Sequence, residues 1–193
     1  MVGILALQGG FDKHKKVLKK IGVPCILVKN EQDLFKTKAL IIPGGESTTL
    51  SILIDRFLLR NHILEYSRKN SIFGTCAGMI MLSSTESLKN KVKTLNIMNF
   101  SVSRNSWGRQ IFSFQEKIDF NIFNIPSFNS IFIRAPKVKK ESIGKEILRY
   151  DFLGKEVVIL EDKRHMACSF HPELGEDLRI HEYFLNNYYY EKN

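Results

Sequence analysis

The sequence predicts a three-layer α/β fold, in which a mainly parallel sheet carries helices on both faces and continues into an antiparallel extension. Three observations support this. Apolar runs alternate with helical segments through the first 85 residues, an order typical of a parallel sheet covered on both sides. From about residue 87, short segments rich in Ile and Phe indicate antiparallel strands. Residues 176–190 are amphipathic and predict a closing helix.

Four strands and the helices between them are expected in the first half of the chain. Residues 2–7 form an apolar run, and residues 11–21 follow as a helix with lysines opposite an apolar stripe. Gly22 ends that helix, because glycine readily takes the left-handed conformation of a helix C-cap. The later elements are a strand at 23–28, a short helix at 30–35, a strand at 39–42, helices at 47–59 and 63–69, a strand at 71–73 and a helix at 77–82.

The second half of the chain is expected to add the antiparallel strands. Its apolar segments are short, and Asn, Ser, Gly and Pro separate them, with Gly154 in the turn of a hairpin. The expected strands lie at residues 96–103, 109–116, 117–120, 130–133, 146–150, 156–161 and 165–169. A chain of 193 residues with this pattern is most economically one domain, residues 1–193.

Composition and charge narrow the functional classes. The hydrophobic fraction of 44% and the charged fraction of 25% are those of a soluble globular protein, and no apolar run is long enough to cross a bilayer. The 29 Lys and Arg residues exceed the 20 Asp and Glu residues and give a net charge of +9. These basic residues are scattered and have no aromatic-interleaved patch beside them, so nucleic-acid binding is not indicated. The first residues lack a basic leader and do not suggest a signal peptide.

The three cysteines, Cys25, Cys76 and Cys168, lie too far apart to suggest a disulfide framework or a metal set. They indicate a reducing compartment, most simply the cytoplasm, and no metal or organic cofactor is indicated. Cys25 and Cys168 lie in apolar runs and are expected in the core. Four histidines show no partner pattern, and we expect them at surface or packing positions: His14, His62, His165 and His181.

The strongest chemical signal is Cys76, which stands between Gly74 and Gly78. The apolar run before it and the helical run after it predict a sharp strand-to-helix turn, which exposes a nucleophile and requires small neighbours. The start of a helix favours the Cys76 thiolate, and the backbone N–H of Ala77 would point at an oxyanion. The alternative is a buried cysteine in an ordinary turn.

His171 and Glu173 supply the groups that a thiol nucleophile needs. They are two residues apart, so in extended backbone both side chains lie on the same side. A thiol requires a base, and the base requires a third group that fixes its tautomer. Without Cys76, a capping turn after the last strand would explain this segment. Class I amidotransferases and hydrolase-fold esterases both remain open, but the acid follows the histidine here, which favours the amidotransferases.

A third element is the glycine loop PGGESTT at residues 43–49, which ends a strand and opens a helix. Its glycines let backbone N–H groups approach a ligand, and the helix N-terminus favours an oxyanion or a carboxylate. A phosphate-binding loop is the rival interpretation, but the spacing differs and no lysine follows. Ser or Thr capping after a tight turn explains part of this motif.

Six motifs together resemble the family of glutaminase subunits of pyridoxal 5′-phosphate synthases, which are class I glutamine amidotransferases. They are LQG at residues 7–9, PGGESTT at 43–49, FGTCAG at 73–78, RNSWGRQ at 104–110, FIRAP at 132–136 and CSFHPEL at 168–174. The cysteine and histidine motifs are shared by class I glutaminases, whereas the GGESTT, RNSxGRQ and IRAP motifs distinguish this subfamily. The resemblance covers nearly the whole chain and implies a flavodoxin-like, class I amidotransferase-like fold.

The resemblance also implies roles for individual residues. Cys76 would attack the glutamine carboxamide, His171 would act as base and acid, and Glu173 would orient His171. The oxyanion would be stabilised at Gly45, Ala77 and Gln8. The residues matching the family's glutamine-binding positions are Gly45, Glu46, Ser47, Arg104, Ile133 and Arg134.

The family's ammonia passes to a separate synthase subunit, a (β/α)₈ barrel that makes pyridoxal 5′-phosphate (vitamin B6), and family glutaminases are nearly idle until they dock on it. A barrel does not fit into 193 residues beside this domain, so the partner would be another chain. Two alternatives remain. One is a class I glutaminase that serves another synthase, such as that of imidazole glycerol phosphate, and the other is a catalytically silent scaffold with this fold.

Overall fold

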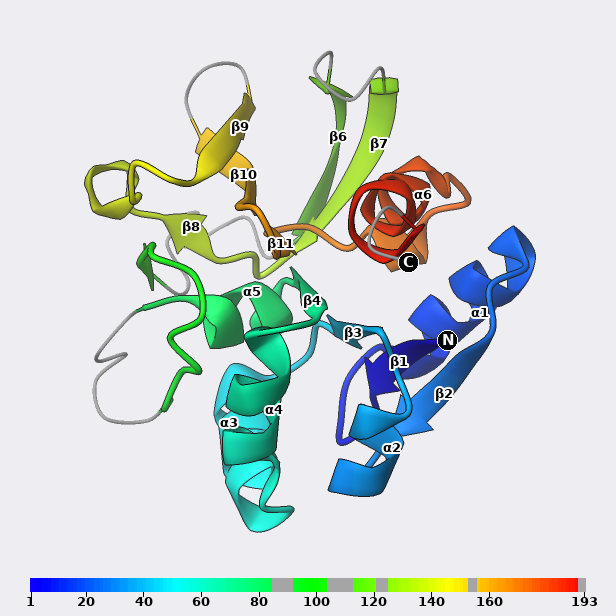
Figure 1. Ribbon diagram of the computed structural model, residues 1–193. Helices are drawn as coiled ribbons and strands as arrows, with labels where there is room; N and C mark the ends of the chain where they lie inside the picture. The colour runs from blue at the N-terminus through cyan, green and yellow to red at the C-terminus, as the bar shows by residue number, and fades with distance from the viewer. Residues whose placement is uncertain (85–91, 104–112, 121–124, 153–155, 191–193) are drawn as a thin grey trace.

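The computed structural model describes residues 1–84, 92–103, 113–120, 125–152 and 156–190. A seven-stranded sheet forms its centre (Figure 1). Five neighbouring strands run parallel, and β10 pairs antiparallel with both of its neighbours. The strands in spatial order are β2 (Cys25–Val28), β1 (Val2–Leu5), β3 (Ala39–Ile42), β4 (Ser71–Thr75), β11 (Met166–Cys168), β10 (Glu156–Glu161) and β9 (Leu148–Phe152). This confirms the predicted parallel sheet with an antiparallel extension.

Helices cover both faces of the sheet, and each face has its own apolar core. On one face pack α2 (Glu31–Phe35), α3 (Ser47–Arg56), α4 (Leu59–Ser67) and α5 (Ala77–Leu82). On the other face pack α1 (Phe11–Ile21) and α6 (Arg179–Leu185). The predicted three layers are therefore present, and Gly22 caps α1 in the left-handed conformation, as expected.

A long antiparallel ribbon stands beside α6 (Figure 1). It consists of β6 (Ser113–Phe120) and β7 (Ile125–Ile133), and its Phe128 and Phe132 pack with Phe170 in the α1–α6 core. The expected strands at 117–120 and 130–133 are the ends of these longer strands. Pro126 and the polar residues around it hid the alternating pattern of β7 in the sequence.

Other expectations for the second half are partly wrong. Residues 96–101 form no strand, and only β5 (Val102–Ser103) pairs with β8 (Lys137–Val138). The closing helix begins later than expected, at Arg179, and ends in the π-helical turn η4 (Asn186–Tyr190). Gly154 and residues 109–112 lie outside the described residues. A short 3₁₀ helix, η2 (Lys140–Ser142), precedes β9.

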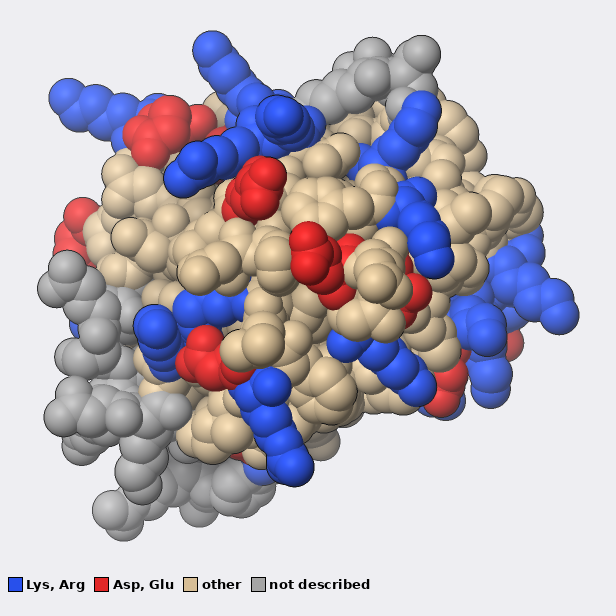
Figure 2. Space-filling view, turned by 60° about the horizontal axis from the view of Figure 1, so that its bottom comes forward, with Lys and Arg blue, Asp and Glu red and all other residues tan. Residues whose placement is uncertain are grey.

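The face shown in Figure 2 carries charges of both signs without concentrating either. Figure 2 shows Lys and Arg side chains spread over the visible face, with Asp and Glu among them. Among the described residues, none of the helices combines the length and the apolar character that crossing a membrane requires.

The arrangement of the strands brings distant segments together. Strands β3, β4 and β11 are parallel neighbours, so the segments that follow them leave the sheet at the same edge. These segments are the glycine loop, the Cys76 turn and the His171 turn. Ligand sites of open α/β sheets lie at this carboxyl edge.

Candidate active site

Cys76 lies at a strained turn between β4 and α5. Its backbone has φ 49° and ψ −102°, a left-handed conformation that a non-glycine residue keeps only where the surroundings enforce it. Its N–H donates to the carbonyl of Cys168 at 2.8 Å. A Cβ on Gly78 would collide with the carbonyl of Ile42, and a Cβ on Gly74 would lie 2.6 Å from the backbone of Gly78. The turn thus requires both glycines, as the sequence motif predicts.

His171 and Glu173 meet through a turn, not through the extended backbone that we expected. The 3₁₀ helix η3 (Pro172–Leu174) follows His171 and folds the carboxylate back onto the imidazole. The distance from His171 Nδ1 to Glu173 Oε1 is 2.7 Å. The backbone N–H of His171 donates to the carbonyl of Ile131 at 2.8 Å, which attaches this turn to β7.

The pKa values of Glu173 and His171 both differ strongly from their ordinary values. Burial raises the pKa of Glu173, but the nearby His14 ring, the hydrogen bond with His171 and the charge of His171 lower it to about 2. Burial lowers the pKa of His171, but hydrogen bonds and charge from Cys76 and Glu173 raise it to about 10. The arrangement therefore favours the imidazolium form of His171 beside an ionised Glu173.

The glycine loop lies directly against the histidine. A Cβ on Gly44 would collide with the His171 ring and come within 3.2 Å of the Cys76 Cβ. The N–H of Gly44 donates to Thr75 Oγ1 at 3.1 Å, which fixes the loop to the residue before the cysteine. Only glycine permits this close approach of the loop to the two side chains.

Gln8 and Glu46 hold the rest of the loop. The N–H of Glu46 donates to Gln8 Oε1 at 3.1 Å, and a Cβ on Gly45 would collide with the Gln8 carboxamide. The Glu46 carboxylate accepts the backbone N–H groups of Thr48 and Thr49 at the start of α3, at 3.0 and 2.6 Å. Burial raises the pKa of Glu46, but these hydrogen bonds lower it to about 2.

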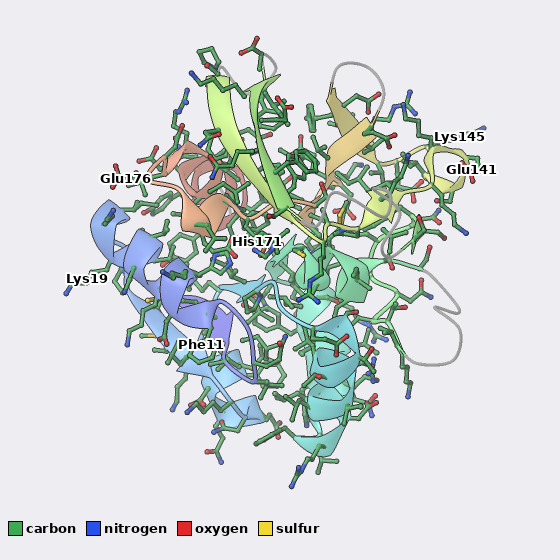
Figure 3. The ribbon with its side chains drawn as sticks, turned by 180° about the vertical axis from the view of Figure 1, so that it is seen from behind. Phe11, Lys19, Glu141, Lys145, His171 and Glu176 are labelled. Atoms are coloured by element: carbon green, nitrogen blue, oxygen red, sulfur yellow. The ribbon has the colours of Figure 1, made fainter. Side chains whose placement is uncertain are left out.

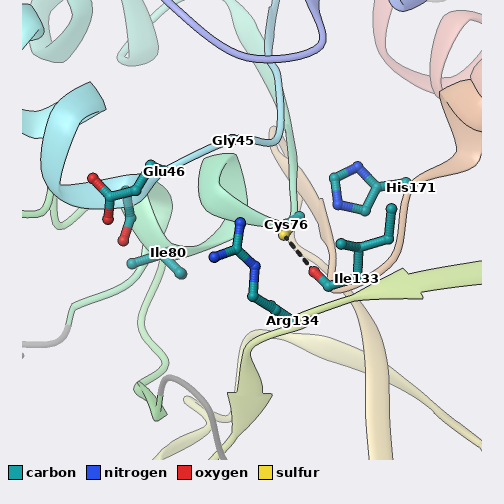
Figure 4. A pocket seen from close by; sticks show the side chains of 8 residues that line it. Gly45, Glu46, Cys76, Ile80, Ile133, Arg134 and His171 are labelled. Carbon is teal, nitrogen blue, oxygen red and sulfur yellow. Dashed lines mark hydrogen bonds between the residues drawn. The ribbon is translucent and has the colours of Figure 1, made fainter. Parts of the chain in front are cut away.

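These segments enclose a pocket of about 220 Å³ (Figure 4). This is smaller than the roughly 300–1,000 Å³ of sites for drug-sized ligands and suits a small molecule. The Cys76 thiol points into it, 3.8 Å from the carbonyl of Ile133, and the Arg134 guanidinium enters beside it. The lining residues are Gly45, Glu46, Ser47, Cys76, Ile80, Ile133, Arg134 and His171.

Most of the residues that the sequence predicts are therefore close together. Glu173 lies behind His171, and Ala77 is buried as the first residue of α5. Gln8 contacts the loop at Gly45 but does not line the pocket. Arg104 lies outside the described residues. The described part of the chain contains no group of three His, Cys, Asp or Glu side chains that could hold a metal ion.

Two residues near the site were missed. Ile80 follows Cys76 by one helical turn and lines the same pocket, which helix periodicity could have indicated. His14, expected at a surface or packing position, is fully buried and lies 3.6 Å from Glu173. Its place on the apolar stripe of α1 was the available signal, because a buried histidine needs polar partners.

The arrangement suits acyl transfer. A thiol, an imidazole and a carboxylate are the groups that a covalent mechanism requires, and backbone N–H groups of the glycine loop lie beside them.

Comparison with known proteins places the chain among amidotransferases. The sequence profile of the SNO glutamine amidotransferase family matches residues 4–190. The chain is 41% identical to the pyridoxal 5′-phosphate synthase subunit PdxT of Oenococcus oeni, over 95% of this chain and 94% of the relative. It is 44% identical to the subunit of the same name from Methanoregula boonei, over 96% of this chain and 97% of the relative.

Solved structures agree with the fold. A crystal structure of a glutamine amidotransferase superposes with a TM-score of 0.88 at 37% identity and covers 96% of this chain and 97% of its own. A glutamine amidotransferase from Thermotoga maritima, at 18% identity and a TM-score of 0.60, covers 96% of this chain and 83% of its own and shares the fold.

Proposed function

This chain belongs to the SNO glutamine amidotransferase family, and we propose that it is the glutaminase subunit of a pyridoxal 5′-phosphate synthase. It hydrolyses L-glutamine to L-glutamate and ammonia. One observation carries this proposal: Cys76 in its strained turn shares a pocket with His171, whose Nδ1 lies 2.7 Å from Glu173. The names of the relatives, at 41% and 44% identity over nearly the whole chain, support the pathway.

The proposed reaction proceeds through a thioester. The Cys76 thiolate attacks the carboxamide carbon of glutamine, the C–N bond breaks, and the His171 imidazolium gives its proton to the departing ammonia. A water molecule then attacks the thioester carbonyl while His171 accepts its proton. The C–S bond breaks, glutamate leaves and the thiolate is restored. Glu173 holds the tautomer of His171 throughout.

The pocket explains how glutamine would be held. The Arg134 guanidinium suits the α-carboxylate because its fork can bind both oxygens, and we assign Arg104 a similar part. Gly45, Glu46, Ser47 and Ile133 line the remaining walls.

The oxyanion would be stabilised by the N–H groups of Gly45 and Ala77, with Gln8 nearby. In this structure Gln8 Nε2 is buried and, among the described residues, has no hydrogen-bond partner. An unpaired donor of this kind fits a site that is completed only when a synthase subunit docks. We therefore propose that ammonia passes to a separate barrel-shaped synthase chain. The free thiols of Cys25, Cys76 and Cys168 support a place in the cytoplasm.

The test is ammonia release from glutamine by the purified chain, alone and with its cognate synthase. We expect activity that rises on adding the synthase and is lost in Cys76→Ala. Cys25→Ala is the matched control, because it removes a half-buried thiol on β2. No ammonia release under either condition, from a folded chain, would overturn the glutaminase assignment and favour a silent scaffold. Activity that ignores this synthase and rises with another would favour the other class I glutaminases.

A further inference from the structure

Two histidines from opposite ends of the chain lie buried behind Glu173. His14 is on α1 and His181 is on α6, and neither has any exposed surface. These two helices pack against each other, and α1 also contacts the η3 turn that carries Glu173. Figure 3 shows His171 beside these two helices, on the side toward the centre of the molecule. Burying polar rings in this way is costly unless their nitrogens are engaged.

The two rings form a directed chain of polar contacts. His14 Nδ1 lies 2.9 Å from His181 Nε2, and His14 Nε2 lies 3.6 Å from Glu173 Oε2. His171 already donates to the other carboxylate oxygen, and Oε2 has no hydrogen-bond partner among the described residues. A lone pair facing an anionic oxygen would be repelled, so the His14 proton resides on Nε2. His14 Nδ1 then accepts the Nε2–H of His181.

His14 also contacts the two other parts of the site. Its Nε2 lies 3.3 Å from Thr75 Oγ1, the same oxygen that accepts the N–H of Gly44. Thr75 directly precedes Cys76, and Gly44 contacts His171. One imidazole therefore connects the carboxylate, the strand end that carries the nucleophile and the glycine loop.

We propose that His14 is a positioning residue of the glutaminase reaction, in which its neutral Nε2–H stabilises the Glu173 carboxylate and His181 fixes its tautomer. This inference rests on the proposed function. The competing explanation is that His14 only fills space in the core. An apolar side chain would also fill that space, whereas the His14 ring places Nε2 3.6 Å from the Glu173 carboxylate.

The charge states support this role. The pKa of His14 is lowered overall. Burial has the largest effect and lowers it, the Glu173 charge raises it, and the His171 charge lowers it further. Burial and the His14 charge lower the pKa of His181 to about 3, against the raising effect of Glu173. Both rings are therefore neutral near pH 7. The titratable groups that face this cluster are Glu173, His171, Cys76 and Cys168.

The test compares His14→Leu, which removes both ring nitrogens, with His14→Gln, whose amide N–H can replace Nε2–H. The complex with the cognate synthase is assayed for kcat and KM with glutamine. In His14→Leu we expect kcat to fall on the order of tenfold or more, with KM changed less than about twofold. His14→Gln should restore most of kcat. His62→Leu is the control, because it removes a partly exposed histidine whose ion-pair partner is Glu31.

A second readout does not require glutamine turnover. The protonation of the His171 ring is followed by NMR against pH. Without the His14 donor, the Glu173 carboxylate is less stabilised and attracts the His171 proton more strongly, so His171 keeps its proton to higher pH. We expect the midpoint in His14→Leu to rise by roughly half a pH unit or more, and to stay near the wild-type value in His14→Gln.

The outcomes are distinct. An unchanged kcat and His171 midpoint in His14→Leu would overturn the proposal, as would equal losses in both His14 variants with no shift of the midpoint. If glutamine is not hydrolysed by any variant but the midpoint still shifts, the proposed function fails and the positioning role stands. If His14→Leu does not fold, His181→Phe keeps a ring against Phe73 and replaces it. A raised midpoint there supports the proposal, and an unchanged one overturns it.

Discussion

The His171 ring occupies the space into which a side chain on Gly44 would project. We therefore expect Gly44→Ala to displace the imidazole and reduce kcat/KM for glutamine by on the order of 100-fold or more. The fold should survive, because Gly44 does not have a positive φ. Glutaminase assays and thermal unfolding measure the two effects.

Gly22→Ala is the matched control for this prediction. A Cβ there meets nothing within 4 Å, but φ is 83°, so the variant should lose about 1 kcal/mol of unfolding free energy and no activity. Near-normal activity of Gly44→Ala would contradict the close approach of the loop to His171.

Glu173→Gln tests the charge behind the imidazole. The amide oxygen can still accept the Nδ1–H of His171, but the negative charge that helps to raise the His171 pKa is lost. We expect kcat to fall on the order of 100-fold and the alkaline limb of kcat/KM, where the His171 imidazolium loses its proton, to move to lower pH. A pH–rate profile measures this shift. An unaltered alkaline limb would show that Glu173 only orients the ring.

The acid sensitivity of the fold should depend on Glu46 and Glu173. The pKa of each is about 2 in the folded chain, against an ordinary 4.5. A lowered folded-state pKa contributes stability above about pH 4.5, which is lost as the pH falls towards 2. His171 has a raised pKa of about 10, so its contribution is present below about 6.5 and is lost as the pH rises through 10.

Glu46→Ala tests how much of this acid sensitivity comes from Glu46, the exposed one of the two carboxylates. It removes the cap of α3 and should lower the unfolding free energy by about 1 kcal/mol at pH 7. The loss should shrink at pH 3, where the Glu46 carboxyl of the unfolded chain is protonated while that of the folded chain, with a pKa of about 2, is still ionised. Urea unfolding at pH 3 and pH 7 measures it, with Glu65→Gln on the exposed face of α4 as the control. A loss that is the same at both values would contradict an ionised cap.

The parallel half of the sheet and the nucleophile turn could be predicted because their signals are local. Gly74 and Gly78 lie two residues before and two residues after Cys76, and their backbone requirements follow from that spacing. The antiparallel half was predicted less well, since pairing between β6 and β7 depends on contacts that periodicity does not contain.

The part played by His14 could not be predicted from local sequence. Its partners Thr75, Glu173 and His181 lie 61 to 167 residues away, and only the folded topology brings them together. The contact between His171 and Glu173 could be predicted although the backbone forms a turn and not an extended segment. A separation of two residues keeps the side chains close in either conformation. A polar residue on an apolar helix stripe thus predicts that buried polar partners exist, but only the folded structure shows which residues they are.

Hydrogen bonds with Glu161 attach the C-terminal segment to β10. Three tyrosine hydroxyls donate to the buried carboxylate of Glu161 on β10, with Tyr188 at 2.8 Å, Tyr150 at 2.5 Å and Tyr183 at 3.0 and 3.1 Å. Tyr188→Phe keeps the stacking on Phe184 but removes a donor to an acidic group. We expect a loss of about 1.5–3 kcal/mol in unfolding free energy with kcat unchanged.

Tyr190→Phe is the control for this variant, because the Tyr190 side chain is half exposed and its ring contact with Tyr189 is retained. Urea unfolding of the two variants should differ by more than about 1 kcal/mol. Equal stabilities would mean that Tyr150 and Tyr183 alone satisfy Glu161. A loss of activity in Tyr188→Phe would mean that α6, and with it His181, depends on this anchor. The C-terminal tyrosines would then support the site through the helix that carries its second buried histidine.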